Sequence, residues 1–168
     1  SPRTSSMLCF RDKTHAPTSS SCHICIGNRL QRGLRFLATG QGAIADQLYP
    51  AVGCFIPPSR RRARSPIEYL DQVGALAWRP MLIHAVHVDG TDIRRMVGRG
   101  VSVAHCPRST ARLSDRTAPV TDFLTQGIPV GLGTDSLASV PTLDLWDEMR
   151  AAGQAGRLSP SQILEMAT

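Results

Sequence analysis

From residue 65 onward, the chain alternates short apolar runs with segments in which apolar residues recur at helical spacing. Buried strands are expected at residues 81–88, 101–105 and 128–132. The connections between these runs are short and each contains a helical segment, which is typical of parallel strands joined by crossover units. The pattern therefore predicts an α/β fold.

The expected helices begin at residues that favour a helix N-terminus. They follow Ser65, Asp89, Pro119 and Ser159, and a further helix is expected at residues 142–152. In the second of these helices, Ile93, Met96 and Val97 form one apolar stripe. Residues 106–117 contain proline, serine and arginine without such a stripe, so they are expected to form a loop.

The beginning of the chain differs from the rest. Residues 1–33 are rich in Ser, Thr, Cys and Arg and show no sustained period, so they are expected to be irregular. Helical spacing returns at residues 34–49, and residues 57–64 form a basic, proline-containing connector. We therefore divide the chain into an irregular segment, residues 1–33, and one folded unit, residues 34–168.

The net charge of +6 over 168 residues comes from one end of the chain. Residues 1–65 hold ten basic and two acidic side chains, whereas residues 66–168 hold nine basic and eleven acidic. All basic residues but one are arginine, a bias that GC-rich coding also produces, so a nucleic-acid-binding module is only a remote alternative. Neither a membrane span nor a signal peptide is evident, and five irregularly spaced cysteines fit reduced thiols. We expect a cytoplasmic protein without a membrane partner.

Two predicted strands deliver ionisable residues. His84 lies in an otherwise apolar run, and Asp135 follows the run that ends at Leu132. Taken singly, His84 also fits a core histidine bonded to a carbonyl, and Asp135 also fits a helix cap or turn. In a β/α barrel, however, the carboxyl ends of different strands bring reactive residues to one face. A carboxylate beside a metal-bound water can bind the metal and accept a proton, while a nearby imidazole stabilises charge, which suits hydrolysis at an electrophilic carbon.

Three ordered motifs carry a family resemblance. They are Leu-Ile-His-Ala-Val-His-Val-Asp at 82–89, Val-Ala-His-Cys-Pro-Arg-Ser at 103–109 and Gly-Leu-Gly-Thr-Asp-Ser-Leu-Ala-Ser at 131–139. With these motifs, residues 34–168 resemble the C-terminal half of a metal-dependent amidohydrolase. The similar branch contains cytosine and guanine deaminases, chlorohydrolase-like proteins, and adenosylhomocysteine and aminodeoxyfutalosine deaminases. The resemblance implies a partial TIM (β/α)8 barrel, roughly strands 5 to 8, truncated at both ends.

The resemblance also implies the site residues. In this family one divalent metal, zinc or iron, is held by a His-x-His pair, a further histidine and an aspartate. Asp135 matches the aspartate, and His84 matches the histidine that positions water and substrate, so both are expected to be catalytic. His23 is a second candidate metal ligand. His105 and Ser136 are expected to be structural residues near the site.

The chain departs from the family pattern in several places. Thr110 stands where asparagine is usual, His87 is expected to pack rather than to catalyse, and neither His-x-His nor His-x-x-Glu occurs. The sequence Cys-His-Ile-Cys at residues 22–25 alternatively resembles half of a zinc ribbon or a redox pair. Reading residues 23–32 two bases into each codon permits a peptide close to the family's own sequence. We therefore hypothesise that residues 1–33 are wholly or partly a shifted-frame translation.

The resemblance implies a metal-dependent hydrolase of non-peptide carbon–nitrogen bonds. Its small-molecule substrate would be an aminated heterocycle, a nucleoside or a base, and a homo-oligomer is compatible with the sequence. Two alternatives remain open. One is a catalytically inactive fragment of such an enzyme, because most of the metal ligands are missing. The other is a chlorohydrolase-type dehalogenase, which uses the same activated water.

Overall fold

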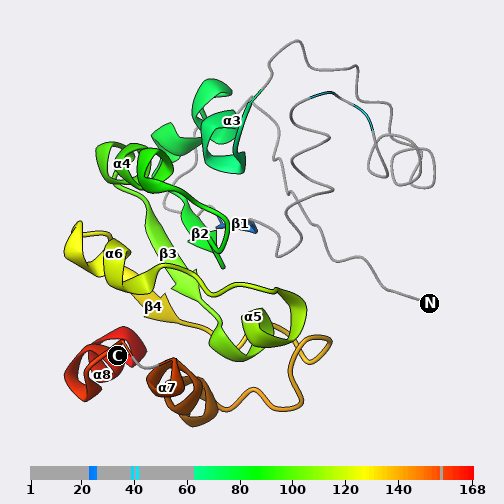
Figure 1. Cartoon of the computed structure of the whole chain (residues 1–168), viewed down its shortest axis with the longest axis vertical. Coiled ribbons are helices and arrows are strands. Elements are labelled where there is room, and N and C mark those ends of the chain that lie inside the picture. The colour runs from blue at the N-terminus through cyan, green and yellow to red at the C-terminus, as the bar shows by residue number, and fades with distance from the viewer. Residues whose placement is uncertain (1–22, 26–38, 40, 42–62, 156) are drawn as a thin grey trace.

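The computed structural model of the chain describes residues 23–25, 39, 41, 63–155 and 157–168. In this part of the chain, four parallel strands lie side by side in the order β1-β2-β3-β4, with helices between consecutive strands (Figure 1). The elements in chain order are β1 (His23–Cys25), α3 (Pro66–Gln72), η2 (Ala75–Trp78), β2 (Met81–Ile83), α4 (Gly90–Arg99), β3 (Ser102–His105), α5 (Pro107–Leu113), α6 (Val120–Thr125), β4 (Val130–Leu132), α7 (Leu145–Gln154) and α8 (Pro160–Ala167). The predicted α/β class with a parallel sheet is confirmed.

The parallel register places three strand ends together. Ile83 of β2 pairs with Ala104 of β3, and His105 of β3 pairs with Leu132 of β4. We call the ends of β2, β3 and β4 at Ile83, His105 and Leu132 the carboxyl edge. Because side chains that follow parallel strands meet at such an edge, residues far apart in the sequence are brought together there.

Side-chain caps begin three helices where the sequence predicted them. Ser65, Asp89 and Ser159 each accept a hydrogen bond from a backbone N–H in the first turn of α3, α4 and α8, respectively. α6 begins after Pro119, as expected, without a side-chain cap. Gly100 ends α4 with a φ of 63°, a left-handed conformation that glycine adopts without a steric penalty.

The strands β2, β3 and β4 occupy the predicted runs, but each is shorter than expected. β2 ends at Ile83 rather than at residue 88, because His84 and Ala85 have φ values of 72° and 46°, which do not continue a strand. β3 begins at Ser102 and β4 begins at Val130, each later than predicted.

The prediction of a loop at residues 106–117 is wrong for residues 107–113. Residues Pro107–Leu113 form helix α5, which has proline at its first position. The buried residues of this helix are Pro107, Ser109 and Thr110, so it has no apolar stripe. A short helix held by polar tertiary contacts gives no hydrophobic period, which is why the sequence pattern did not predict it.

Two helical details also differ from the prediction. α7 begins three residues later than expected, because the Asp144 carboxylate accepts a hydrogen bond from the backbone N–H of Trp146 and caps the helix there. In α4, Ile93 and Met96 are buried as expected, whereas Val97 is 43% exposed. The apolar face of α4 is therefore narrower than its stripe suggested.

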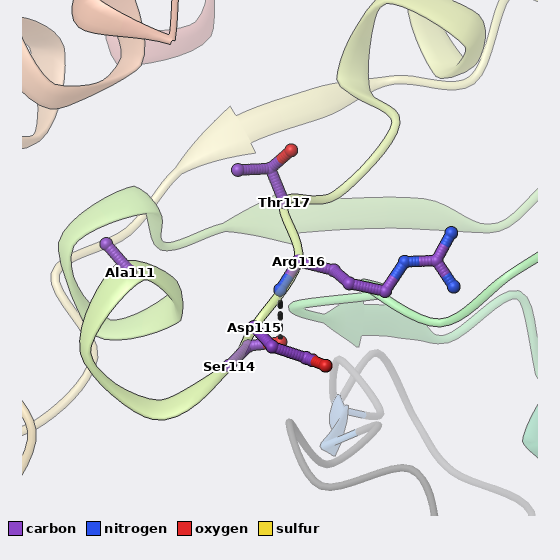
Figure 2. Close-up of a pocket in the computed structure, with 5 residues that line it drawn as sticks. All are labelled: Ala111, Ser114, Asp115, Arg116 and Thr117. Carbon is purple, nitrogen blue, oxygen red and sulfur yellow. Dashed lines mark hydrogen bonds between the residues drawn. The ribbon is translucent and has the colours of Figure 1, made fainter.

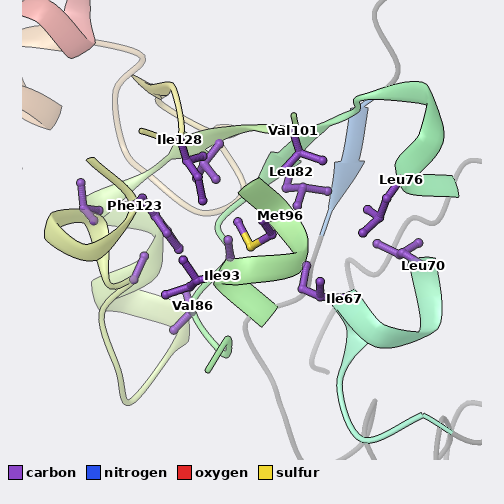
Figure 3. Packing of buried hydrophobic residues seen from close by; sticks show 14 of the residues in the cluster. Ile67, Leu70, Leu76, Leu82, Val86, Ile93, Met96, Val101, Phe123 and Ile128 are labelled. Carbon is purple, nitrogen blue, oxygen red and sulfur yellow. The ribbon is translucent and has the colours of Figure 1, made fainter. Parts of the chain in front are cut away.

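The core packs one face of the sheet against helices α3, α4 and α6 (Figure 3). Leu82 of β2 and Val103 of β3 belong to this cluster together with Ile67, Met96 and Phe123, and all five are at most 1% exposed. Dense apolar packing of this kind holds strands and helices in fixed relative positions. The core therefore fixes the strands whose ends form the carboxyl edge.

Most predictions for the first third of the chain lie outside the described residues. These are the helical spacing at residues 34–49, most of the basic connector at 57–64, and the shifted-frame hypothesis for residues 1–33. Within residues 1–33 the structure describes one element, β1, which pairs with β2. The apolar pattern did not predict this strand, whereas the resemblance to strands 5 to 8 of a barrel implied a strand before β2. Within the described residues, no helix is both long enough and apolar enough to span a membrane.

Candidate active site

Three ionisable side chains lie at the carboxyl edge. His84 directly follows β2, His105 is the last residue of β3, and Asp135 comes three residues after the end of β4. The backbone N–H of His84 donates to the carbonyl of Ala104 at 2.9 Å, and that of Gly133 donates to the carbonyl of His105 at 2.9 Å. These bonds extend the sheet contacts one residue past β2 and β4 and hold both chain segments against β3.

The structure brings the two predicted catalytic residues together. Nε2 of His84 lies 3.8 Å from Oδ2 of Asp135. This separation is within ion-pair range but is longer than a hydrogen bond. The His84 side chain is 5% exposed and the Asp135 side chain is 26% exposed. The imidazole is thus enclosed, while solvent or a ligand can reach the carboxylate.

Both residues have an unusual backbone conformation. In the described part of the chain, four non-glycine residues have positive φ, and three of them are His84 at 72°, Ala85 at 46° and Asp135 at 62°. Such conformations cost about 1–3 kcal/mol each and persist only where the surrounding structure imposes them. Their concentration at one edge supports a functional role for this edge.

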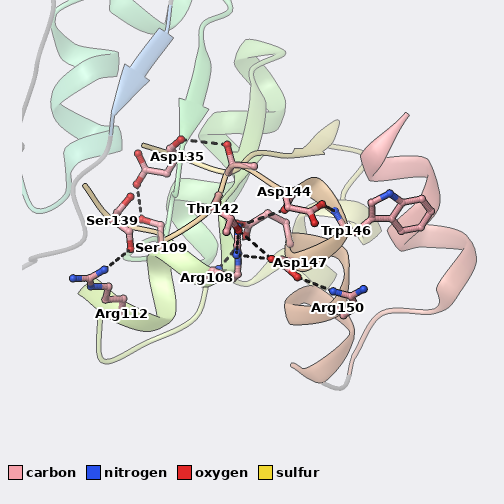
Figure 4. Close-up of polar contacts among 12 residues, drawn as sticks. Arg108, Ser109, Arg112, Asp135, Ser139, Thr142, Asp144, Trp146, Asp147 and Arg150 are labelled. Carbon is pink, nitrogen blue, oxygen red and sulfur yellow. Dashed lines mark hydrogen bonds and ion pairs between the residues drawn. The ribbon is translucent and has the colours of Figure 1, made fainter. Parts of the chain in front are cut away.

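The Asp135 carboxylate is held at both oxygens. The hydroxyl of Ser109, in α5, donates to Oδ2 (Figure 4). The backbone N–H of Ser136 donates to Oδ1 at 2.8 Å. The sequence placed Ser136 near the site, and here its backbone rather than its side chain contacts Asp135. Ser109 is a contact that the sequence did not predict, because the two residues are 26 positions apart and only the fold makes them neighbours.

Burial lowers the pKa of His84, and the nearby negative charge of Asp135 opposes this effect only in part. The imidazole is therefore neutral at pH 7, and it carries one N–H donor and one acceptor nitrogen. Its Nδ1 is buried and has no hydrogen-bond partner among the described residues. A neutral imidazole beside an aspartate can donate a hydrogen bond to an oxygen that develops negative charge.

His105 and His87 are also buried, at 5% and 9% exposure. Burial, together with the neighbouring His84, lowers the pKa of His105 to about 4. His105 therefore stays neutral over the physiological range. Its burial agrees with the structural role that we expect for it, and the packing role of His87 stays a prediction.

The predicted second ligand, His23, is described only through its backbone. His23 pairs with Met81 at the start of β1, and Cys25 at the end of β1 pairs with Ile83. At about 3.3 Å per residue, the His23 backbone lies roughly 10 Å before the level of His84 along the strands. Its role as a metal ligand stays a prediction.

The donor chemistry of the carboxyl edge fits part of a metal site. Imidazole and carboxylate are common zinc ligands, and catalytic zinc sites have three protein ligands. Within the described residues, no group of three or more His, Cys, Asp or Glu side chains could hold a metal ion. A complete site built around Asp135 therefore requires donors other than the side chains that the structure describes.

A network of charged groups joins α5 to α7 beside the site (Figure 4). Arg108 donates from Nε to Oε1 of Glu148 at 2.7 Å and from its backbone N–H to Oε2 at 3.1 Å. Glu148 is 0% exposed. This pair could not be predicted from the sequence, because its two members are 40 residues apart.

A separate open pocket lies at the end of α5 and in the following turn (Figure 2). It is lined by Ala111, Ser114, Asp115, Arg116 and Thr117. The backbone N–H of Arg116 donates to Oγ of Ser114 at 3.2 Å. The pocket has no histidine and one carboxylate, so we assign no chemistry to it.

Residues 58–168 match the sequence profile of the amidohydrolase family. A 5-methylthioadenosine/S-adenosylhomocysteine deaminase of Natronomonas pharaonis is 46% identical over 97 residues, which cover 58% of this chain and 22% of that protein. An aminodeoxyfutalosine deaminase of Deinococcus radiodurans is 43% identical over 126 residues, which cover 72% of this chain and 30% of that protein. The crystal structure of atrazine chlorohydrolase TrzN from Arthrobacter aurescens TC1, complexed with zinc, superposes with a TM-score of 0.65 at 27% identity and covers 88% of this chain and 30% of that one. The chain thus spans less than a third of the length of each of these proteins.

Proposed function

The chain belongs to the amidohydrolase family, and we propose that its carboxyl edge serves the hydrolytic deamination of an adenine-type nucleoside in a metal-dependent enzyme. The observation that carries this proposal is the His84–Asp135 pair, 3.8 Å apart at the ends of two strands. The deaminase names of the relatives from Natronomonas pharaonis and Deinococcus radiodurans support the substrate class.

Asp135 would be one ligand of the metal, together with donors from beyond the described residues. Zinc is the metal that the TrzN complex supports, and iron is the alternative. When bound, such an ion makes water nucleophilic near neutral pH. We further propose that residues 34–168 form the C-terminal half of a TIM (β/α)8 barrel. The parallel arrangement of the four described strands supports this part of the proposal.

The residues of this chain would handle the protons and charge of the reaction. Asp135 accepts one proton as the oxygen of water adds to the ring carbon that bears the amino group. The neutral His84 donates a hydrogen bond from Nε2 and stabilises the negative charge that develops on that oxygen. When the carbon–nitrogen bond breaks, the proton on Asp135 passes to the leaving amine, and ammonia departs. The acid that protonates the ring nitrogen is not identified among the described residues, and the same group would take back a proton from the added hydroxyl as the carbonyl forms.

Chloride displacement is the second candidate function. It is favoured by the structural similarity to an atrazine chlorohydrolase at 27% identity. The same pair would serve this reaction, since water again adds to an electrophilic ring carbon and only the leaving group differs. The two candidates therefore differ in the product that is released.

A product assay separates these functions. The purified chain, supplied with zinc, is incubated separately with 5-methylthioadenosine and with atrazine, and ammonia and chloride are measured. We expect ammonia from the nucleoside, no chloride from atrazine, and a loss of activity of about 100-fold or more in His84→Ala. Asp115→Asn, in the pocket of Figure 2, is the matched control and should retain the wild-type rate. Chloride release without ammonia release would favour the second candidate, and release of neither product would contradict both for this chain.

A further inference from the structure

One side of α5 faces the segment that carries Asp135. Three side chains of this helix, those of Arg108, Ser109 and Arg112, contact the residues between β4 and α7 or α7 itself (Figure 4). Arg112 is four positions after Arg108 and three after Ser109, and residues at these two spacings are neighbours on a helix surface. α5 therefore serves as a support for residues 133–144.

The first contact fixes the start of α5. The Arg108 side chain and backbone bind both oxygens of the fully buried Glu148 in α7. Paired, hydrogen-bonded charges in a buried position have a narrow choice of geometry. The beginning of α5 is thereby held at one position relative to α7.

The remaining donors of the same arginine bind Thr142, which lies before α7, and Asp147, which lies in the first turn of α7. Arg108 donates from Nη1 to Oγ1 of Thr142 at 2.9 Å and to Oδ2 of Asp147 at 3.0 Å. It also donates from Nη2 to the carbonyl of Thr142 at 2.6 Å. Farther along the helix, Nη1 of Arg112 donates to the carbonyl of Ser139 at 3.3 Å. The segment is thus bound to α5 at two further points after Asp135, by arginines that lie before and after Ser109 in the helix.

We propose that Ser109 is a positioning residue for Asp135, an inference that rests on the function proposed above. Ser109 is 0% exposed, so water cannot readily replace its hydroxyl as a donor to Oδ2. The same Oδ2 faces Nε2 of His84, while Oδ1 is held by the backbone of Ser136. With both oxygens held, the plane of the carboxylate is fixed. Without the hydroxyl, one anchor remains and the carboxylate can rotate about its Cβ–Cγ bond.

A purely structural serine would behave differently from a positioning residue. If the hydroxyl only stabilised the segment, its removal would lower the free energy of unfolding and leave the folded site unchanged. A positioning hydroxyl changes the carboxylate in the folded protein. The Ser136 amide reports this change directly, because its N–H donates to Oδ1 of Asp135.

The test compares three variants of the full chain. Ser109→Ala removes the hydroxyl, and Ser109→Cys keeps nearly the same shape with a much weaker donor. Ser114→Ala removes a hydroxyl just after the last residue of the same helix, away from Asp135, and is the matched control. If the alanine variant folds poorly, the same measurements can be made on the cysteine variant, because the cysteine side chain fills the buried position.

The first measurement is the Ser136 amide resonance at constant pH, without added metal. We expect an upfield amide proton in both Ser109 variants and the wild-type position in Ser114→Ala. The second measurement is the steady-state kinetics of ammonia release with zinc. Here kcat should fall about 10–100-fold in the Ser109 variants with little change in KM, as is typical when a residue that orients a metal ligand is lost.

Wild-type resonances in both Ser109 variants would overturn the proposal, as would wild-type kcat values in an active enzyme. Failure of the proposed function has a different signature. In that case wild-type protein releases no ammonia, while the Ser136 resonance still moves in the Ser109 variants and supports the positioning role.

Discussion

His84 and Asp135 share a left-handed backbone conformation that few non-glycine residues adopt. His84 directly follows the last residue of β2, whereas Asp135 lies three residues after the end of β4. Hydrogen bonds to Ala104 and from Ser109 hold the two residues in place. Local strain is therefore imposed at the point where the two functional groups meet.

The buried His105 should make folding stability depend on pH. Its pKa is about 4 in the folded chain, compared with 6.5 for an unperturbed histidine, so the unfolded chain binds a proton more readily. This contribution to stability is complete above pH 6.5 and is lost as the pH falls toward 4. Urea unfolding at pH 8 and pH 5 should show a loss of about 2 kcal/mol from this residue.

The matching variant is His105→Asn, which cannot titrate in this range. Its free energy of unfolding should change less between the two pH values than that of the wild-type chain. An equal change in both proteins would show that His105 is already charged or is not buried.

At this scale the sequence identified the ionisable residues but not the residues that hold them. His84 and Asp135 could be predicted because an ionisable residue at the end of an apolar run is visible locally. The bond from Ser109 could not, because it depends on α5, a helix that the pattern did not predict. The positive φ values of His84 and Asp135 could not be predicted either, because contacts that only the fold creates impose them.

At the scale of elements, α5 is the helix most dependent on tertiary contacts. It has seven residues, which is too short for stability in isolation, and its buried residues include a serine and a threonine. The charged pair of Arg108 and Glu148 links it to α7. The sequence predicted the other described α-helices, α3, α4, α6, α7 and α8, because each has a cap, an apolar stripe or both, and it missed α5 because α5 has neither.

Removing the buried Glu148 carboxylate should be much more destabilising than removing the carboxylate of the partly exposed Asp147. Glu148→Ala leaves the Arg108 charge without its principal partner and should lower the free energy of unfolding by about 3–5 kcal/mol. Asp147→Ala, which removes a partly exposed partner of the same arginine, should cost less than about 1 kcal/mol. Chemical denaturation of both variants measures the difference, and equal losses would contradict the role of Glu148 as the anchor of α5.

At the scale of the molecule, one apolar layer supports the sheet and the carboxyl edge. Leu82 in β2 is 0% exposed and lies in the cluster with Phe123 and Met96 (Figure 3). The alternation of strands and helices could be predicted, because buried parallel strands appear in the sequence as nearly continuous apolar runs. The pattern did not predict β1, because residues 1–33 show no sustained apolar period.

Truncation inside this layer should destabilise the whole described unit. Leu82→Ala should lower the free energy of unfolding by about 2–5 kcal/mol, because it removes buried methyl groups and leaves a cavity. Leu137→Ala, at a position that is 65% exposed, is the matched control and should change it by less than about 0.5 kcal/mol. Thermal or urea unfolding followed by circular dichroism provides the comparison. A similar small effect in both variants would mean that the cluster does not form a cooperative core.

The central claim is that the carboxyl edge with Asp135 performs metal-dependent deamination. The most direct test is the initial rate of ammonia release from 5-methylthioadenosine by the zinc-supplied chain and by Asp135→Asn, with both shown to be folded. We predict that the wild-type chain releases ammonia and that the variant is slower by about 100-fold or more. Equal rates in the two proteins would contradict the claim.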